Sequence, residues 1–358
     1  MKIADLKIEN NIKTEIHLNE NNDFYEFLVR EIDKYESVFI LSDNEISNKI
    51  FNKVTSLDKS KIFNINFNIT SNFKSEKNVK YILDFLVKKK CNKNSLLVSL
   101  GGGSISDITG FISSIYMRGI DHIIIPTTLL SMVDASIGGK TAIDFHGIRN
   151  LIGTFNHPKK ILLSLGFLNS LSKIEKINGL AEILKYSLIM DYSLFELLEK
   201  KGISIFDNKN FNVLKKIIIK CIKHKIYIVE KDQYDSSIRN ILNFGHTAGH
   251  ALESYYDFKI SHGIGVLLGI KVAAKISLEI NNISIKEYNR IIEYVDGLNL
   301  DDLEFIDINK IVELMYFDKK SETNQINYII LDGIGKAVMK KNIDIKLIKE
   351  GLSIIWIY

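Results

Sequence analysis

The sequence of 358 residues contains only two cysteines, only two prolines and no long apolar run. Because Cys91 and Cys221 cannot build a disulfide framework or a CxxC motif, they indicate a reducing compartment such as the cytoplasm. No stretch of about 18 apolar residues is present, and the first residues lack the apolar core of a signal peptide, so we expect neither a membrane span nor secretion. The net charge of +4 is small for this length and gives no indication of a nucleic-acid partner.

Apolar residues make up 46% of the chain and follow two different patterns along it. In the first part, short apolar runs alternate with amphipathic stretches such as residues 75–90. We expect strands at residues 38–41, 62–65, 96–100 and 123–125. This alternation predicts an α/β fold with a parallel sheet wound by helices.

From about residue 173 onward, helical periods dominate the sequence. They cover residues 175–190, 192–201, 210–231, 240–255, 263–280 and 285–296. Because the chain is long for a single core, we expect two domains. We place the boundary near residue 172, with an α/β domain over 1–172 and an all-helical domain over 173–358.

A glycine-rich turn follows the strand expected at residues 96–100. It reads Gly-Gly-Gly-Ser-Ile-Ser-Asp over residues 101–107 and stands before a helix. Glycine lets the backbone approach a pyrophosphate, whose charge the N–H groups of a helix N-terminus then hold. The turn predicts nucleotide binding, although many strand–helix joints contain glycines and the usual GxGxxG spacing is absent.

A second glycine pair precedes Lys140 in the segment Gly138-Gly139-Lys140-Thr141. The segment is similar to the end of a phosphate-binding P-loop, but the upstream glycine at the required spacing is missing. Lys140 is therefore a candidate point charge for a substrate anion. The alternative is a solvated surface lysine.

The most informative stretch is residues 239–250, which contain Arg239, Asn243, His246 and His250. On a helix, the i, i+4 spacing puts both imidazoles on one face. A third histidine follows at His262, and an upstream helix carries Glu182. Two histidines and a carboxylate leave a zinc-like ion an open position, which is typical of a catalytic metal site. Alternatively, the histidines cap or line a buried helix.

Taken together, these segments resemble the 3-dehydroquinate synthase family of sugar-phosphate cyclases. The resemblance runs in order from about residue 38 to about residue 340. Its motifs are residues 101–107, Tyr116-Met117-Arg118-Gly119, 126–134, 138–141, Gly179-Leu180-Ala181-Glu182 with Lys185, 239–250, His262-Gly263 and Asp318-Lys319-Lys320. It implies a Rossmann-like NAD-binding domain, a helical metal-binding domain and a homodimer.

The resemblance also implies an activity. The enzyme would be a lyase of the shikimate pathway, which leads to aromatic amino acids. It would convert a seven-carbon keto-acid phosphate, 3-deoxy-D-arabino-heptulosonate 7-phosphate, to 3-dehydroquinate and phosphate. NAD would oxidise and later re-reduce the substrate, and a divalent metal, zinc or cobalt, would assist.

The family's site residues carry over to matching positions of this sequence. The implied metal ligands are Glu182, His246 and His262. The implied substrate-pocket residues are Lys185, Lys225, Arg239, Asn243, His250 and the carboxylate of Asp134, with Lys140, Asn150 and Lys319 or Lys320 near the phosphate. The implied NAD contacts are Asp43, Lys74, Gly102, Gly103, Ser104, Asp107, Thr127, Thr128, Lys140, Arg149, Phe167 and Ser170. Arg118 matches an arginine that reaches the neighbouring subunit's site.

Three positions depart from the family pattern. Ile264 stands where a glutamate usually follows the last metal ligand, so a carboxylate that could orient the metal site is missing there. Arg149 replaces a lysine, and Ser71 replaces a glutamate that would meet the cofactor ribose.

Three other functions remain open at this stage. A related sugar-phosphate cyclase would share the fold, NAD and metal, but Asn150, Asn243 and His250 match the dehydroquinate pattern. A metal-dependent polyol dehydrogenase would release NADH stoichiometrically, whereas a synthase gives no net change. An inactive binding or regulatory protein would bind neither metal nor NAD.

Overall fold

The computed structural model describes residues 1–9, 11–19, 24–44, 46, 60–70, 72–146, 148–300, 307–318 and 326–356. The chain forms two compact units: the first comprises Met1–Lys176 and Lys225–Tyr234, and the second comprises Ile177–His224 and Asp235–Tyr358. The first unit is therefore not contiguous in sequence. Within the described ranges, no helix is both long and apolar enough to cross a membrane.

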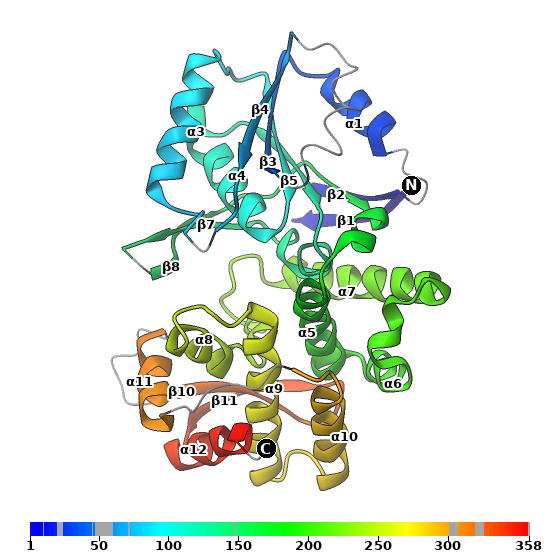
Figure 1. Ribbon diagram of the computed structural model, residues 1–358, viewed down its shortest axis with the longest axis vertical. Helices are drawn as coiled ribbons and strands as arrows, with labels where there is room; N and C mark the ends of the chain where they lie inside the picture. Colours follow the sequence, from blue (N-terminus) through cyan, green and yellow to red (C-terminus); the bar gives the residue numbers. More distant parts are fainter. Residues whose placement is uncertain are drawn as a thin grey trace. The chain divides into compact units, whose positions relative to one another are not determined.

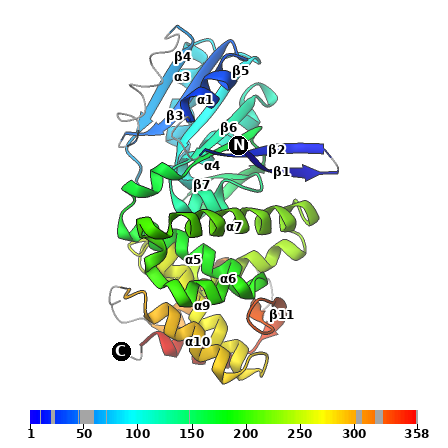
Figure 2. The ribbon, with the colours of Figure 1, turned by 90° about the vertical axis from the view of Figure 1, so that its right-hand side faces the viewer.

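A seven-stranded sheet forms the centre of the first unit (Figure 1). Its order is β1-β2-β9-β6-β5-β3-β4, and all neighbours run parallel except β1 and β2. The strands are β1 (Lys2–Ile8), β2 (Asn11–Asn19), β3 (Ser37–Asp43), β4 (Ile62–Phe67), β5 (Ser95–Gly101), β6 (Asp121–Pro126) and β9 (Lys160–Ser164). The four predicted strands are confirmed as β3 to β6, and the parallel sheet is confirmed with them. The sequence analysis missed β1, β2 and β9, of which β1 and β2 project as a hairpin (Figure 2).

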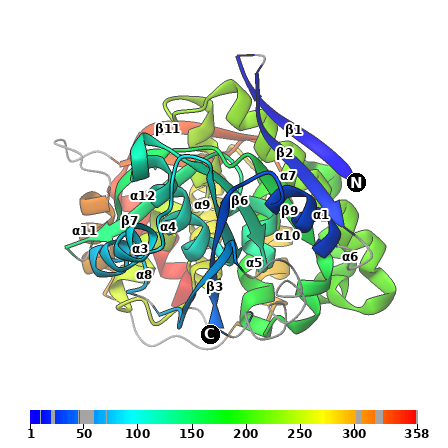
Figure 3. The ribbon, with the colours of Figure 1, turned by 90° about the horizontal axis from the view of Figure 1, so that it is seen from above.

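Helices cover both faces of this sheet, because alternate residues of its strands point to opposite sides. Phe39 and Leu41 of β3 pack against α3 (Glu76–Lys88) and α4 (Gly103–Ile115). Val38 and Ile40 pack on the other side, against α1 (Phe24–Ile32). Figure 3 shows β3 between these helices from above. The first unit is thus a three-layer α/β fold.

Shorter elements complete the first unit. They are η1 (Tyr116–Arg118), η2 (Ser131–Ala135), η3 (Leu165–Ser170) and a two-stranded sheet of β7 (Lys140–Phe145) and β8 (Ile148–Phe155). The C-terminal part of α7 (Phe211–Lys231) also belongs to this unit.

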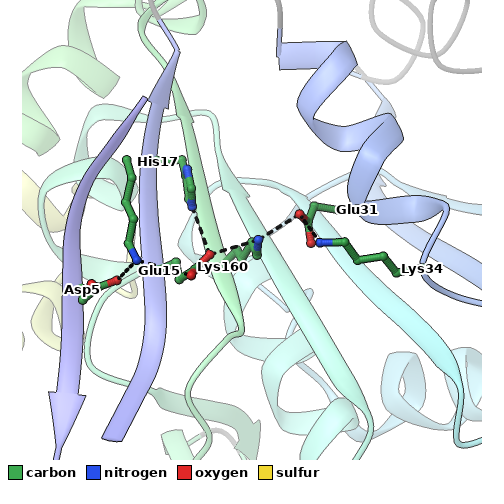
Figure 4. A network of polar contacts seen from close by, with 7 residues as sticks. Asp5, Glu15, His17, Glu31, Lys34 and Lys160 are labelled. Atoms are coloured by element: carbon green, nitrogen blue, oxygen red, sulfur yellow. Dashed lines mark hydrogen bonds and ion pairs between the residues drawn. The ribbon is translucent and has the colours of Figure 1, made fainter. Parts of the chain in front are cut away.

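A charge network ties one edge of the sheet to α1 (Figure 4). The Lys160 Nζ atom lies 2.8 Å from Glu31 Oε1 and 3.0 Å from Glu15 Oε2, so one ammonium joins β9, β2 and α1. The hydrogen bond from Lys160, with further ones from His17 and Lys2, lowers the pKa of Glu15 to about 2. The network therefore links β2 and β9 to α1 through charged side chains.

The second unit is mainly helical, and α9 runs through its centre (Figure 1). Residues 263–274 of α9 are all buried, with α8, α10, α12 and β10 packed around the helix. The helices are α5 (Lys173–Met190), α6 (Tyr192–Lys201), α8 (His246–Tyr255), α9 (His262–Glu279), α10 (Ile285–Asp296), α11 (Ile308–Asp318) and α12 (Ile345–Ser353), with short turns η4 (Gly202–Phe206), η5 (Asn208–Asn210), η6 (Ile238–Asn243) and η7 (Ile354–Trp356).

Two details of this unit differ from the prediction. The hairpin of β10 (Ile326–Leu331) and β11 (Ala337–Ile343) interrupts the expected all-helical pattern. The single helix expected at residues 240–255 is broken, because Gly245 adopts a left-handed conformation with φ of 78°. The chain forms the turn η6 before this glycine, and α8 starts directly after it at His246.

Candidate active site

The glycine-rich turn of the first unit lies between β5 and α4. Gly102 is the N-cap of α4, so the N–H groups of the first helical turn are available to an anion. A Cβ atom on Gly102 would lie 3.3 Å from Thr128 Cγ2, and the Thr127 N–H donates to the Gly101 carbonyl at 3.0 Å. The turn and the Thr127-Thr128 pair therefore lie against each other and form one surface, where the helix N-terminal N–H groups suit a pyrophosphate.

This surface lies at the carboxyl edge of the parallel strands. The chain passes from β3 outward to β4 and then returns to β5 on the other side of β3. Such a reversal opens a crevice where nucleotides bind in doubly wound sheets. Asp43 ends β3 and Gly102 follows β5, so two of the expected NAD contacts flank this crevice. Phe167 and Ser170 lie in η3, directly after β9.

Lys74, Asp107 and Asn150, three further residues of the predicted site, contact one another through Lys74. The Lys74 ammonium lies 2.8 Å from Asp107 Oδ2 and also donates to the Asn150 side-chain carbonyl. The Asn150 N–H donates to Asp144 Oδ1 at 2.8 Å, with Asn150 in a left-handed conformation. The structure thus brings together two residues expected at NAD and one expected near the substrate phosphate.

A buried ion pair forms a second polar cluster in the first unit. Lys225 of α7 pairs with Asp134 of η2, and the Lys225 side chain is only 9% exposed. Lys140 begins β7 and is exposed, directly after Gly138 and Gly139, which both have positive φ. Asp134 and Lys225, both expected in the pocket, are therefore in direct contact.

The three candidate metal ligands converge within the second unit. Glu182 lies in α5 and is fully buried, His246 begins α8, and His262 begins α9. The Nε2 atoms of His246 and His262 lie 3.4 Å and 3.3 Å from Glu182 Oε1. One ligand atom from each residue fits within a group whose members are all within 4.8 Å of one another.

This donor set fits a zinc-like ion. A tetrahedral ion with ligand bonds of about 2.0–2.1 Å has ligand atoms about 3.3 Å apart. The two distances to Glu182 match that separation. Two imidazoles and one carboxylate leave a fourth position for a substrate oxygen, and nitrogen donors select against magnesium and calcium.

Glycines allow the helices that carry the histidines to cross at very short distance. A Cβ atom on Gly249 would lie 2.9 Å from the Gly265 carbonyl oxygen, and one on Gly269 only 1.8 Å from the Gly245 carbonyl oxygen. The α8 and α9 backbones are therefore in direct contact at these glycines. His246 and His262 are the first residues of these two helices, so we expect this contact to determine their separation.

Each of these two histidines also makes a hydrogen bond through its other ring nitrogen. The Nδ1 atom of His246 lies 3.0 Å from the Phe244 carbonyl oxygen. The Nδ1 atom of His262 lies 2.9 Å from Glu253 Oε1. Both partners are acceptors, so Nδ1 carries the proton in each ring. The Nε2 atoms are the ring nitrogens directed at Glu182, and they can bind a cation once they carry no proton.

The electrostatics of the ligand group follow from burial and close partners. Burial alone would raise the pKa of Glu182, but the Lys185 ammonium and His246 hold the pKa of this carboxyl well below its usual value. Burial alone would lower the pKa of His262, but hydrogen bonds with Glu182 and Glu253 outweigh it and raise this pKa to about 10. Lys185 is itself buried and pairs with Glu182 one turn away in α5. The group is therefore charged and ready to exchange protons for a cation.

Glu253 is the site residue that the sequence analysis missed. It belongs to a second potential metal-binding group with His250 and His262. A signal was present in the sequence, since Glu253 follows His250 by three residues and His246 by seven. These spacings put all three side chains on one face of α8.

The remaining predicted residues occupy varied surroundings. Arg239 is 1% exposed in η6, and Asn243 ends the same turn. Arg149 in β8 and Arg118 in η1 are exposed. Ser71, Lys319 and Lys320 lie outside the described residues, so the structure does not place the three of them.

Comparison with known proteins gives the family. The family model described as 3-dehydroquinate synthase N-terminal matches residues 64–178, and the C-terminal model matches residues 179–321. A 3-dehydroquinate synthase of Campylobacter fetus subsp. fetus (strain 82-40) is 34% identical over 339 residues, which cover 93% of this chain and 96% of that protein. One of Pelagibacter ubique (strain HTCC1062) is 39% identical over 331 residues, which cover 89% and 90%. The chain belongs to the 3-dehydroquinate synthase family.

Two solved structures share the fold of this 3-dehydroquinate synthase family member. One is ValA, a 2-epi-5-epi-valiolone synthase from Streptomyces hygroscopicus subsp. jinggangensis 5008 with NAD+ and Zn2+ bound, at a TM-score of 0.87, 21% identity and 99% coverage of both chains. The other is a 2-deoxy-scyllo-inosose synthase complexed with carbaglucose-6-phosphate, NAD+ and Co2+, at a TM-score of 0.85, 22% identity and coverage of 95% and 96%. These likenesses concern the fold.

Ile264 is one of the three departures from the 3-dehydroquinate synthase pattern, and the structure shows its surroundings. Ile264 is buried in the first turn of α9, two residues after His262. The carboxylate that contacts His262 from outside the ligand group comes instead from Glu253 of α8.

Proposed function

We propose that this protein catalyses the 3-dehydroquinate synthase reaction. The substrate would be 3-deoxy-D-arabino-heptulosonate 7-phosphate, and the products would be 3-dehydroquinate and phosphate. The observation that carries the proposal is the convergence of Glu182, His246 and His262 with an open fourth position. The relatives named 3-dehydroquinate synthase, which are similar to this chain over most of their length, support this activity.

We propose NAD and a divalent metal, zinc or cobalt, as cofactors. The glycine-rich turn at the β5–α4 joint supports the first, and the nitrogen-rich donor set supports the second. When bound, NAD would accept and return a hydride, and the ion would polarise the oxygen at the oxidised carbon. NAD and metal in the two related cyclase structures support the same pair.

The chain's own residues would bind and orient the substrate. Buried Arg239 and Lys185 supply fixed positive charge in the second unit, which suits a substrate carrying both a carboxylate and a phosphate. We propose His250 and Asn243 as further pocket residues. Lys140, Asn150 and one of Lys319 and Lys320 would hold the phosphate, which itself takes the proton during its elimination.

In the first unit, the Asp134–Lys225 pair would act between cofactor and substrate. Lys225 is held by Asp134 in a largely buried position, so its ammonium has a fixed direction.

We propose that residues 1–172 act as the NAD-binding domain and residues 173–358 as the metal- and substrate-binding domain.

We propose a homodimer in which Arg118 completes the neighbouring site. Arg118 and the preceding Met117 are exposed and adopt positive φ, which turns the chain sharply and presents both side chains. Strand β8 supports an interface, because it exposes Ile148, Leu151 and Phe155, with fractions of 54%, 36% and 39%. Exposed apolar groups of this kind mark association surfaces.

Mixing two inactive variants tests the shared site. Arg118→Ala and Glu182→Gln would each abolish turnover alone. After subunit exchange, a hybrid dimer would hold one site with Glu182 from one chain and Arg118 from the other. Random exchange would restore roughly a quarter of the wild-type activity. No recovery in exchanged dimers, or a monomer by light scattering, would refute the shared site.

Two buried free thiols support a reducing location. Cys91 and Cys221 are both buried, and neither forms a disulfide. Because an oxidising compartment favours disulfides in secreted chains, we propose that the protein works in the cytoplasm.

Phosphate release tests the proposed activity. The purified protein would receive the heptulosonate phosphate, catalytic NAD and zinc or cobalt, with NADH absorbance followed in the same cuvette. Many turnovers of phosphate without accumulating NADH are expected. Stoichiometric NADH would instead indicate a polyol dehydrogenase. Absence of phosphate from protein that binds metal and NAD would refute the proposal.

A further inference from the structure

The His262 imidazole is held from both of its ring nitrogens. Its Nε2 atom lies 3.3 Å from Glu182 Oε1, inside the ligand group, and its Nδ1 atom lies 2.9 Å from Glu253 Oε1. The Glu253 side chain is 3% exposed, whereas that of His262 is 30% exposed. The carboxylate thus sits on the protein side of the ring and is shielded from water.

Close helix packing fixes Glu253 in this place. A Cβ atom on Gly265 of α9 would lie 3.1 Å from Glu253 Cγ and 3.4 Å from Glu253 Oε1. The missing side chain at position 265 therefore makes room for the glutamate beneath the first turn of α9. Gly249, one turn before Glu253 in α8, contacts the same part of α9.

We infer that Glu253 is a positioning residue of the metal centre, which orients His262 and strengthens it as a ligand. This inference rests on the proposed metal-dependent function. A carboxylate behind a ligating histidine fixes the tautomer, locks the ring direction and raises the basicity of the other nitrogen. The backbone carbonyl of Phe244 does the first two for His246 but carries no charge. Glu253 therefore supplies the negative charge that Ile264 does not.

An alternative role for Glu253 is that of a direct ligand, because it forms a potential metal-binding group with His250 and His262. Such an ion would have to bind His262 through Nδ1 and would break its hydrogen bond to Glu253. His262 could then bind an ion beside Glu182 only if both of its ring nitrogens bound metal, which requires a bridging imidazolate. The positioning role keeps all the observed contacts and requires one ion per chain.

Metal affinity separates these roles. Zinc and cobalt dissociation constants would be measured on the apo chain by competition with a chromophoric chelator. Glu253→Ala should weaken binding about 10- to 100-fold, as expected for loss of an outer-sphere carboxylate. Glu253→Gln retains an acceptor oxygen, so this conservative variant should lose less metal affinity than Glu253→Ala. In the zinc-loaded protein, the His262 Nδ1–H proton should be protected from exchange in the wild type and exposed in Glu253→Ala.

Asp296→Asn is the matched control. It removes the partner of Lys271, another buried cation of α9, and should lower stability without changing metal affinity. Equal metal affinity of wild type and Glu253→Ala would overturn the inference and leave the proposed function standing. A wild type that binds no metal would overturn both. Two ions per wild-type chain and one in Glu253→Ala would assign Glu253 as a ligand and overturn the positioning role.

Discussion

Replacing Gly269 by alanine should damage the metal centre without touching any ligand. The added methyl carbon would lie 1.8 Å from the Gly245 carbonyl oxygen and 2.9 Å from the Gly249 nitrogen. Ordinary contact begins at 3.4 Å, so α8 and α9 must separate by about 1.6 Å at this point. Both obstacles are backbone atoms, which cannot rotate away as a side chain would.

The size of the effect follows from two opposing terms. Alanine in a helix interior is about 1 kcal/mol more favourable than glycine. Overpacking against a rigid neighbour costs about 1–3 kcal/mol and more when backbone must move. Because both obstacles are backbone atoms, the cost should reach the top of that range, about 3 kcal/mol, so we expect Gly269→Ala to lower the free energy of unfolding by about 2 kcal/mol.

Metal binding should suffer more than stability. His246 directly follows Gly245, so a shift of α8 moves this ligand away from His262. Metal–ligand distances tolerate only about 0.2 Å of error. We therefore expect cobalt affinity to fall by more than about 100-fold, which exceeds the loss from an outer-sphere change.

Denaturant unfolding and cobalt titration of the folded protein would measure both effects. Gly297→Ala is the matched control, because Gly297 caps α10 with φ of −64°, which alanine adopts freely. Its Cβ atom would lie 3.1 Å from the Glu293 carbonyl oxygen, which is much less severe than the contact at Gly269, so we expect unchanged cobalt affinity and only a small change in stability. If Gly269→Ala bound cobalt as tightly as the wild type, the helix crossing would not set the ligand geometry.

Three further outcomes are expected. Glu182→Gln removes the anionic ligand and leaves Lys185 buried without its carboxylate; it should lose about 3–5 kcal/mol of unfolding free energy and all turnover in the phosphate assay. Burial lowers the pKa of His122 to about 3, so the unfolded chain takes up a proton below about pH 6.5 that the folded chain refuses. His122 therefore lowers the free energy of unfolding by about 2 kcal/mol as the pH falls from 7 to 5. Urea titrations at the two pH values should show a correspondingly smaller loss in His122→Asn. Lys74→Met breaks the pair with Asp107 beside the glycine-rich turn and should weaken NAD binding roughly tenfold by calorimetry, with unchanged metal affinity.

The central strands were predictable because they are buried on both faces. All seven residues of β5 are buried, and its sequence is mostly apolar through Leu96, Leu97, Val98 and Leu100, with turn glycines after it. Strand β2 is different: only Thr14, Ile16 and Leu18 of its described side chains are buried, and polar residues stand between them. Its partner β9 lies about 140 residues away in sequence. The alternation is the pattern of a half-buried strand and could have predicted β2, whereas its distant pairing with β9 leaves no local signal.

The candidate ligands could be selected by residue type and resemblance, but their geometry could not. The sequence places His246 and His250 on one helical face, yet only the crossing of α8 and α9 decides which imidazole faces Glu182. That crossing depends on backbone contact between glycines, which no local pattern specifies. Glu253 was missed for a related reason, since its partner His262 belongs to another helix.

The discontinuous first unit has a consequence for the order in which the protein folds. Its residues up to Lys176 are completed by Lys225–Tyr234, which the ribosome adds only after 48 intervening residues. The late segment supplies the Lys225 partner of Asp134, the Glu230 carboxylate that accepts from the Lys7 N–H at 2.8 Å, and the Tyr234 ring that packs on Phe155. Domains usually fold during synthesis from the N-terminus onward. Here these three contacts must wait for α7, so the first unit should be completed only after most of α7 is synthesised, and a fragment ending at residue 172 should be less stable than the unit in the full chain.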